Sequence, residues 1–179
     1  AGSNRAPNII FILADDLGAG DVRCFNPQGK IATPHLDALA ARGMMLTEAH
    51  SSSAVCTPTR YNILTGRYNW RSTLKQGVLG GFSPPLIEPG RLTVADLLRG
   101  QGYHTAAIGK WHLGLEWVRG ARNDLVDSTP KKKANAKTKA VAAEDDAGSG
   151  IDFTKPFGRG PTTLGFDEFF GIKIGRASC

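Results

Sequence analysis

The motif Cys-Thr-Pro-Thr-Arg at residues 56–60 combines a potential nucleophile with a cation at the start of an expected helix. Thr57 can cap this helix, Pro58 suits its first position, and Arg60 falls in its first turn. Cys56 would then lie at a positive helix end beside a guanidinium, where an anionic substrate and an ionised nucleophile are both stabilised. A buried structural cysteine is the alternative. The spacing from Cys56 to Arg60 is too short for the phosphate loop of a cysteine-dependent phosphatase.

Two adjacent carboxylates, Asp15 and Asp16, directly follow the apolar run at residues 8–14. In open α/β sheets, ligands collect at the carboxyl ends of the strands. Neighbouring carboxylates repel each other, and a hard divalent cation would relieve that repulsion. The pair is therefore a candidate metal site, although the same residues also serve as turns or helix caps.

Lys110 and His112 belong to the segment Gly-Lys-Trp-His-Leu-Gly at residues 109–114. In an extended backbone, residues two apart point the same way, so the ammonium and the imidazole could face one anion together. Trp111 would point the opposite way, into packing. We expect the other histidines to be ordinary surface residues: His35, His50 and His104.

Helix and strand signals alternate around these groups. The run at 8–14 lacks polar alternation and predicts a strand buried on both faces. Thr33, Pro34 and Gly43 delimit an amphipathic helix. A second helix starts at the capping-box pair Thr93 and Asp96 and stops by Gly102, and residues 103–108 read as another strand. This order predicts an α/β layered fold.

Composition excludes several classes of protein. The chain has 179 residues, of which 41% are hydrophobic and 21% charged, as in ordinary globular proteins. Its longest apolar run is far shorter than the roughly 20 residues that cross a bilayer, so we expect no membrane span. Three widely spaced cysteines do not make a disulfide framework. We found no cleavable leader, so Ala1 is expected to be a processed or engineered N-terminus.

The net charge of +6 does not indicate nucleic-acid binding. Residues 119–150 hold seven basic and five acidic residues, which nearly cancel within one segment, and no nucleic-acid-binding motif is present. Large apolar residues almost vanish there, which predicts a basic surface insertion at about 119–150. An exposed helix through 131–143 is the alternative, because Lys and Ala are good helix formers.

Together these groups resemble one family, the type I (formylglycine-dependent) sulfatases of the alkaline-phosphatase-like superfamily. The resemblance rests on residues 7–18, on the signature 56–60 with Leu-Thr-Gly-Arg at 64–67, on 109–114, and on Gly-Phe-Asp at 165–167. It implies a three-layer αβα fold with a mostly parallel central sheet. It also implies hydrolysis of a sulfate monoester, either an aryl or a carbohydrate sulfate.

The resemblance further implies a role for each candidate residue. Cys56 would be oxidised by a formylglycine-generating modification system, and the hydrate of the aldehyde would be the nucleophile. Asp15 and Asp16 would bind a calcium ion that also contacts position 56. Arg60 would orient the hydrate, Lys110 would bind nucleophile and sulfate, and His112 would assist collapse of the diol.

The sequence also departs from the family. An Asp-Asn pair expected to complete the calcium shell occurs nowhere in the chain, and the family's later histidine and lysine are not found. Residues 173–179 match nothing in the family. We therefore expect the chain to be the N-terminal part of a sulfatase whose C-terminal subdomain is absent, with weak or no turnover by itself.

Two alternatives to a sulfatase remain open. One is a phosphonate monoester or phosphodiester hydrolase of the same superfamily, and the other is a non-catalytic fragment that binds an anion or sugar. Family habit favours an exported protein, periplasmic, secreted or lysosomal-like. Four residues after the signature could contact a sugar or aryl group, or could be packing and surface: Tyr68, Trp70, Arg71 and Lys75.

Overall fold

The computed structural model describes residues 6–120 and 150–172. The chain divides into two compact units, Ala1–His50 and Ser51–Cys179, and each is described by itself. Most of the predicted insertion, and Cys179, lie outside the described residues. Within the described part, every helix is too short or too polar to cross a membrane.

The first unit holds the 3₁₀ turn η1 (Ala19–Asp21) and the helix α1 (Pro34–Arg42). Proline opens α1 and Gly43 follows its last residue, so the predicted helix is confirmed. Asp37 accepts hydrogen bonds from the Cys24 amide and the Thr33 hydroxyl, both at 2.9 Å. These bonds tie the preceding loop to the first turn of α1.

The predicted strand at residues 8–14 is not formed in the described chain. The run is extended but belongs to no strand, and Ile10 is 85% exposed. The prediction was wrong here because a parallel strand exists only with hydrogen-bonded neighbours. An apolar run favours burial of the segment, but it does not specify the neighbouring strand with which the segment would pair.

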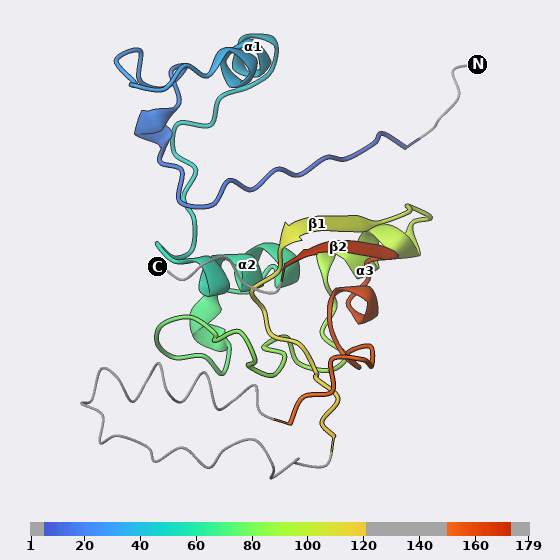
Figure 1. Ribbon diagram of the computed structural model, residues 1–179. Coiled ribbons are helices and arrows are strands. Elements are labelled where there is room, and N and C mark those ends of the chain that lie inside the picture. Colours follow the sequence, from blue (N-terminus) through green and yellow to red (C-terminus); the bar gives the residue numbers. More distant parts are fainter. Residues whose placement is uncertain (1–5, 121–149, 173–179) are drawn as a thin grey trace, which may run out of the picture. The chain divides into compact units, whose positions relative to one another are not determined.

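The second unit is built around two parallel strands, β1 (Ala106–Lys110) and β2 (Glu168–Ile172), whose register pairs Ala106 with Glu168 and Lys110 with Ile172. Its helices are α2 (Cys56–Thr65) and α3 (Val94–Gly100), with 3₁₀ turns η2 (Asn69–Arg71) and η3 (Pro161–Thr163). Figure 1 shows the two strands side by side. A parallel strand pair together with helices in one unit confirms the predicted α/β class.

Strand β1 starts three residues later than predicted. Thr105, directly before it, forms hydrogen bonds with the Gly-Phe-Asp motif at 165–167 and is not part of the strand ladder. The Thr105 amide donates to the Asp167 carboxylate at 2.8 Å, and the Thr105 hydroxyl donates to the Gly165 carbonyl. The Gly-Phe-Asp motif thus fixes the start of the strand pair. The Asp167 pKa is lowered by the Thr105 amide and hydroxyl, which stabilise the carboxylate.

The capping box predicted for α3 is present. The Thr93 hydroxyl accepts from the Asp96 amide at 3.1 Å, and the Asp96 carboxylate accepts from the Thr93 amide at 3.3 Å. Thr93 is buried and also donates to the Leu164 carbonyl at 2.8 Å. The cap therefore joins α3 to the core, whose buried members are Tyr61, Leu86, Ile87, Trp111, Leu113, Leu115 and Leu164.

The two ends of the predicted insertion lie next to each other. Arg119 and Ile151 form an antiparallel bridge, and the Gly120 amide donates to the Gly150 carbonyl at 2.9 Å. The chain leaves and re-enters the unit at one point. The insertion itself stays a prediction.

Candidate active site

Helix α2 begins at the candidate nucleophile. Cys56 is its first residue, Val55 is the N-cap, and Pro58 occupies the third helical position. The expectation that Thr57 caps the helix was wrong, because its hydroxyl is used in tertiary bonding. The left-handed Gly66 (φ 64°) ends α2 as expected. Cys56 is buried at the positive end of the helix.

Two hydrogen bonds connect the first turn of α2 to the last residue of β1 and to the turn that follows it. The Arg60 guanidinium donates to the Lys110 carbonyl, and the fully buried Thr57 hydroxyl donates to the His112 carbonyl at 3.0 Å. Thr57 also accepts from the Leu79 amide at 3.3 Å. Two motifs separated by about 50 residues are therefore in direct contact, and this contact positions Cys56 relative to Lys110 and His112.

His112 is held in a defined orientation. It is buried, and its Nε2 lies 2.7 Å from the Leu79 carbonyl oxygen. A carbonyl only accepts, so Nε2 carries the proton and a neutral ring presents Nδ1 as its acceptor. The imidazole is thus suited to take a proton at Nδ1.

The expected alternation of Lys110 and His112 does not apply, because the extended backbone ends with β1 at Lys110 and His112 is left-handed (φ 53°). Trp111 is buried as predicted, and its indole Nε1 donates to the Gly114 carbonyl at 2.9 Å. The turn geometry, and not a strand period, decides where His112 points.

A segment that the sequence analysis missed, residues 79–88, supports this turn. The Leu86 amide donates to the Leu113 carbonyl at 2.9 Å, and the Leu115 amide donates to the Ser83 carbonyl at 3.1 Å. Gly114 has φ 76°, and a Cβ there would collide with the Pro84 backbone. These contacts use backbone groups, which leave no signature of residue type. The paired prolines at 84–85 were the one available signal of an irregular segment.

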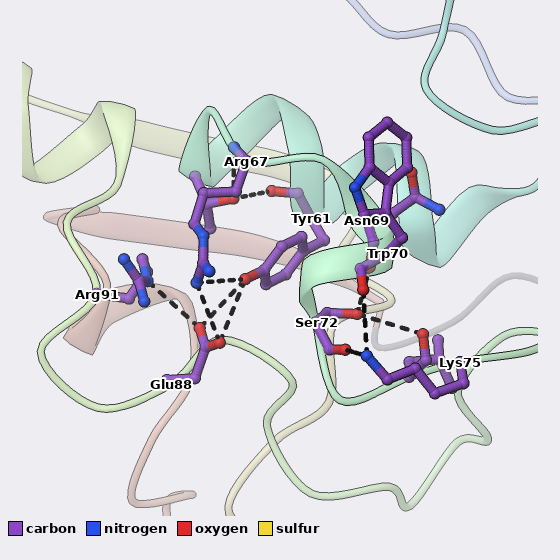
Figure 2. A network of polar contacts seen from close by, with 10 residues as sticks. Tyr61, Arg67, Asn69, Trp70, Ser72, Lys75, Glu88 and Arg91 are labelled. Atoms are coloured by element: carbon purple, nitrogen blue, oxygen red, sulfur yellow. Dashed lines mark hydrogen bonds and ion pairs between the residues drawn. The ribbon is translucent and has the colours of Figure 1, made fainter.

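Glu88 connects this segment to the end of α2 (Figure 2). Its carboxylate accepts from the buried Tyr61 hydroxyl at 3.3 Å and lies 3.5 Å from Arg67 and 3.4 Å from Arg91. Burial alone would raise the Glu88 pKa, but its own backbone amide and Arg91 outweigh burial, so the pKa is lowered. Burial, and then the Glu88 charge, raise the Tyr61 pKa. The ionised carboxylate is thus favoured.

Asp15 and Asp16 belong to the first unit, so their placement is described separately from that of Cys56. Both are exposed, and Asp16 is left-handed (φ 57°). Among the described residues, Asp16 and His112 are the two non-glycine residues with positive φ. Backbone strain of this kind gathers at functional sites.

The donor chemistry of the aspartate pair fits a calcium ion, since hard cations take carboxylate oxygens. In residues 6–120 and 150–172, no group of three or more His, Cys, Asp or Glu side chains is gathered for a metal. Calcium takes six to eight ligands. The two aspartates would therefore supply only part of its shell.

The remaining histidines lie on the surface as expected. His35 and His50 are exposed, with His50 at 3.6 Å from Glu48. His104 is also exposed and hydrogen-bonds Glu168 at 3.0 Å.

Comparison with known proteins identifies one family. The sulfatase family model matches residues 7–174, so the expectation that the family match ends before residue 173 was wrong by two residues. An N-acetylgalactosamine-6-O-sulfatase of Bacteroides thetaiotaomicron is 46% identical over 113 residues, which are 63% of this chain and 22% of that protein. Human arylsulfatase A is 43% identical over 111 residues, covering 62% of this chain and 22% of that enzyme.

Solved structures agree with the sequence comparison. A protein described with the metabolism of multiple glycosaminoglycans by Bacteroides thetaiotaomicron matches with a TM-score of 0.71 at 37% identity, over 94% of this chain and 28% of that one. Ps i-CgsB in complex with k-i-k-neocarrahexaose matches with a TM-score of 0.57 at 28% identity, over 96% of this chain and 29% of that one. The chain thus spans about a fifth of the length of the curated relatives it matches. The alkaline-phosphatase-like fold expectation is confirmed.

Proposed function

Because this chain belongs to the sulfatase family, we propose that the complete protein hydrolyses a sulfate monoester with its nucleophile at position 56. The observation that carries the proposal is the bonding of the first turn of α2 to the turn after β1, through Arg60 to Lys110 and Thr57 to His112. These bonds bring the backbones of Lys110 and His112 to the first turn of the helix that begins with Cys56 and carries Arg60. Such an arrangement suits an anion that gains charge during reaction.

Each residue has a role that its chemistry supports. The Arg60 guanidinium, already held by the Lys110 carbonyl, orients the nucleophile and offsets its charge. The Lys110 ammonium binds the nucleophile and the sulfate. His112 takes a proton at Nδ1, because Leu79 engages Nε2. These donors stabilise charge without reorganising during the reaction.

Cys56 is proposed to be converted to formylglycine by a modification system of the host. When present, the aldehyde hydrate supplies one oxygen for attack on sulfur and a second hydroxyl through which inorganic sulfate is expelled. A plain thiol lacks that second hydroxyl. The position of Cys56 at a helix N-terminus, with Arg60 in the same first turn, supports a reactive role.

Asp15 and Asp16 are proposed to hold a calcium ion. Bound calcium would offset negative charge on the sulfate, which lowers the cost of bringing an anionic ester to an anionic nucleophile. The remaining ligands would come from other parts of the protein.

The proposed substrate class is an aryl or carbohydrate sulfate. The names of the relatives support it, because one is an N-acetylgalactosamine-6-O-sulfatase, one is an arylsulfatase, and one structure holds a neocarrahexaose. The proposed location is outside the cytoplasm, in a periplasm, a secreted fraction or a lysosome-like compartment.

The test uses the complete protein from its native host, with 4-nitrophenyl sulfate as substrate. We expect Cys56→Ala to abolish turnover, and mass spectrometry of the wild-type peptide to show formylglycine at position 56. Removal of calcium with a chelator should reduce turnover, and Asp15→Asn should mimic that loss. Undiminished hydrolysis by Cys56→Ala would contradict the proposal, while faster hydrolysis of an aryl phosphodiester would favour the phosphodiesterase alternative.

A further inference from the structure

Tyr68 and Trp70 form an exposed pair of stacked rings, called the aromatic surface below, just after α2. Their ring centroids lie 4.1 Å apart with an interplanar angle of 11°, so the rings are stacked. The two residues are 55% and 59% exposed. A stack hides one face of each ring, so this exposure leaves the outer faces in solvent. Single exposed apolar residues are normal on proteins, but an exposed stacked pair offers the outer face of each ring to a ligand that can stack on it.

The loop that carries the pair is rigidly held (Figure 2). The Lys75 ammonium donates to the Trp70 carbonyl at 3.1 Å and to the Ser72 carbonyl at 2.8 Å. The hydroxyl of Ser72, which is 3% exposed, donates to the Asn69 carbonyl at 2.7 Å. A loop fixed by bonds to its own carbonyls loses little entropy when a ligand binds, so the aromatic surface is preorganised.

The aromatic pair lies close to the candidate active site. The left-handed turn at Gly66 leads into η2, which packs against α2, the helix that starts with Cys56. Because ten helical residues span about 15 Å, the pair is within roughly one helix length of the nucleophile. A ligand larger than a single aryl sulfate could contact both.

The charge next to the pair also fits a sulfated ligand. Arg71 is exposed and directly follows Trp70 in η2. An exposed guanidinium can bind a second sulfate or a carboxylate with two hydrogen bonds. Among carbohydrates, a polyanionic chain would therefore bind better than a neutral one.

We propose that Tyr68 and Trp70 are a sugar-stacking subsite that binds an unreacted unit of a sulfated oligosaccharide. The proposal rests on the proposed function, since it assigns the substrate class of the same site. The C–H groups on one side of a pyranose ring carry a partial positive charge, and the face of an aromatic ring is negative. Stacking therefore favours a sugar ring over a second aryl sulfate, and Arg71 adds the preference for an anionic chain.

Binding is tested in the complete protein carrying Cys56→Ala, so that turnover plays no part. Chondroitin 6-sulfate tetrasaccharide is titrated and its binding is followed by isothermal titration calorimetry, because this readout does not depend on Trp70 itself. We expect Trp70→Ala to raise the Kd about tenfold, which corresponds to the upper range for one aromatic contact. Trp70→Phe keeps a ring and should retain most of the affinity.

Turnover supplies the second readout in otherwise wild-type protein. Trp70→Ala should lower kcat/KM for the tetrasaccharide about tenfold and leave 4-nitrophenyl sulfate hydrolysis unchanged. Tyr68→Ala is the second variant, in case the first fails to fold. An equal Kd in wild type and Trp70→Ala, or shielding of Trp70 from iodide quenching in the complete protein, overturns the subsite. A wild type that binds the tetrasaccharide but cleaves no sulfate ester contradicts the proposed function alone.

Discussion

At the scale of single residues, the structural role of Thr57 and Arg60 follows from the groups to which they hydrogen-bond, which their position in the motif 56–60 does not reveal. Thr57 joins α2 to the His112 turn, and Arg60 joins it to Lys110. A guanidinium has five donors, so Arg60 can hold the Lys110 carbonyl and still contact a bound anion. An ammonium at this position is a compact point charge without that fork.

We expect Arg60→Lys to lower kcat for 4-nitrophenyl sulfate about a hundredfold in the complete protein, because one positioned donor in an oxyanion-type site has that effect. The measurement is steady-state turnover, with circular dichroism to check folding. Arg91→Lys is the matched control, since Arg91 contacts Glu88 and no candidate catalytic residue in the described chain. Similar losses in both variants would show that turnover is sensitive to the loss of any guanidinium, and not to that of Arg60 in particular.

At the scale of elements, the turn after β1 depends on the close approach of two backbones. Gly114 and Gly66 are both left-handed, at φ 76° and 64°. An added Cβ meets the Pro84 backbone at Gly114 and nothing within 4 Å at Gly66. A substitution at Gly66 therefore tests the cost of a left-handed backbone alone. A substitution at Gly114 adds the cost of a steric clash with the Pro84 backbone.

Gly66→Ala should destabilise the complete protein by about 1–2 kcal/mol, the ordinary cost of a left-handed residue with a Cβ. Gly114→Ala should cost several-fold more or prevent folding, because the Pro84 segment must move. Urea denaturation followed by circular dichroism compares them. Equal midpoints would mean that the contact between Gly114 and Pro84 is not maintained in solution.

The Glu88 network is the second device at this scale, because it ties α2 to residues 79–88. The pKa of the Glu88 carboxyl is held below the ordinary value of 4.5, so the ionised carboxylate stabilises the folded state. That contribution is present above pH 4.5 and is lost as the pH falls through the lower folded pKa. Since the side chain is partly exposed and the ion pairs are long, the contribution is small.

Glu88→Gln should therefore lower the free energy of unfolding by up to about 1 kcal/mol at neutral pH. The difference from wild type should shrink as the pH is lowered below 4.5. Glu48→Gln is the control, because Glu48 is exposed and pairs with the exposed His50. A difference that stays constant with pH would exclude the charge of Glu88 as its cause.

At the scale of the whole molecule, the strand pair presents apolar side chains to solvent. Ile108 and Phe170 are partners in the register and are 83% and 81% exposed. Adjacent exposed apolar side chains on a strand pair favour association with other apolar surfaces. Polypeptide 1–179 by itself should therefore aggregate readily.

We expect polypeptide 1–179 to bind the dye 8-anilinonaphthalene-1-sulfonate strongly. Ile108→Thr combined with Phe170→Thr should reduce that binding while retaining strand propensity. Leu92→Thr is the control, since Leu92 is 63% exposed but lies outside the strand pair. Unchanged dye fluorescence in the double variant would place the apolar surface elsewhere.

The sequence by itself determined most of the helix boundaries and the choice of candidate reactive groups. Pro34, Gly43, Gly66 and the Thr93–Asp96 pair predicted where helices begin or end, because caps and left-handed positions depend on neighbouring residues. The family could also be predicted from the sequence, since the residue types and spacing in 56–60 and 109–114 carry the resemblance to sulfatases.

The tertiary structure decided how these groups meet. The bond from Thr57 to His112, the carbonyl of Leu79 on the imidazole, and the left-handed turn at His112 all involve backbone groups that every residue type possesses. The absence of the predicted strand at 8–14 has the same cause, because a strand forms only by backbone pairing with a neighbour, and the run itself does not specify that neighbour. Residue types encode propensity and chemistry, whereas contacts between distant backbones arise only when the chain packs.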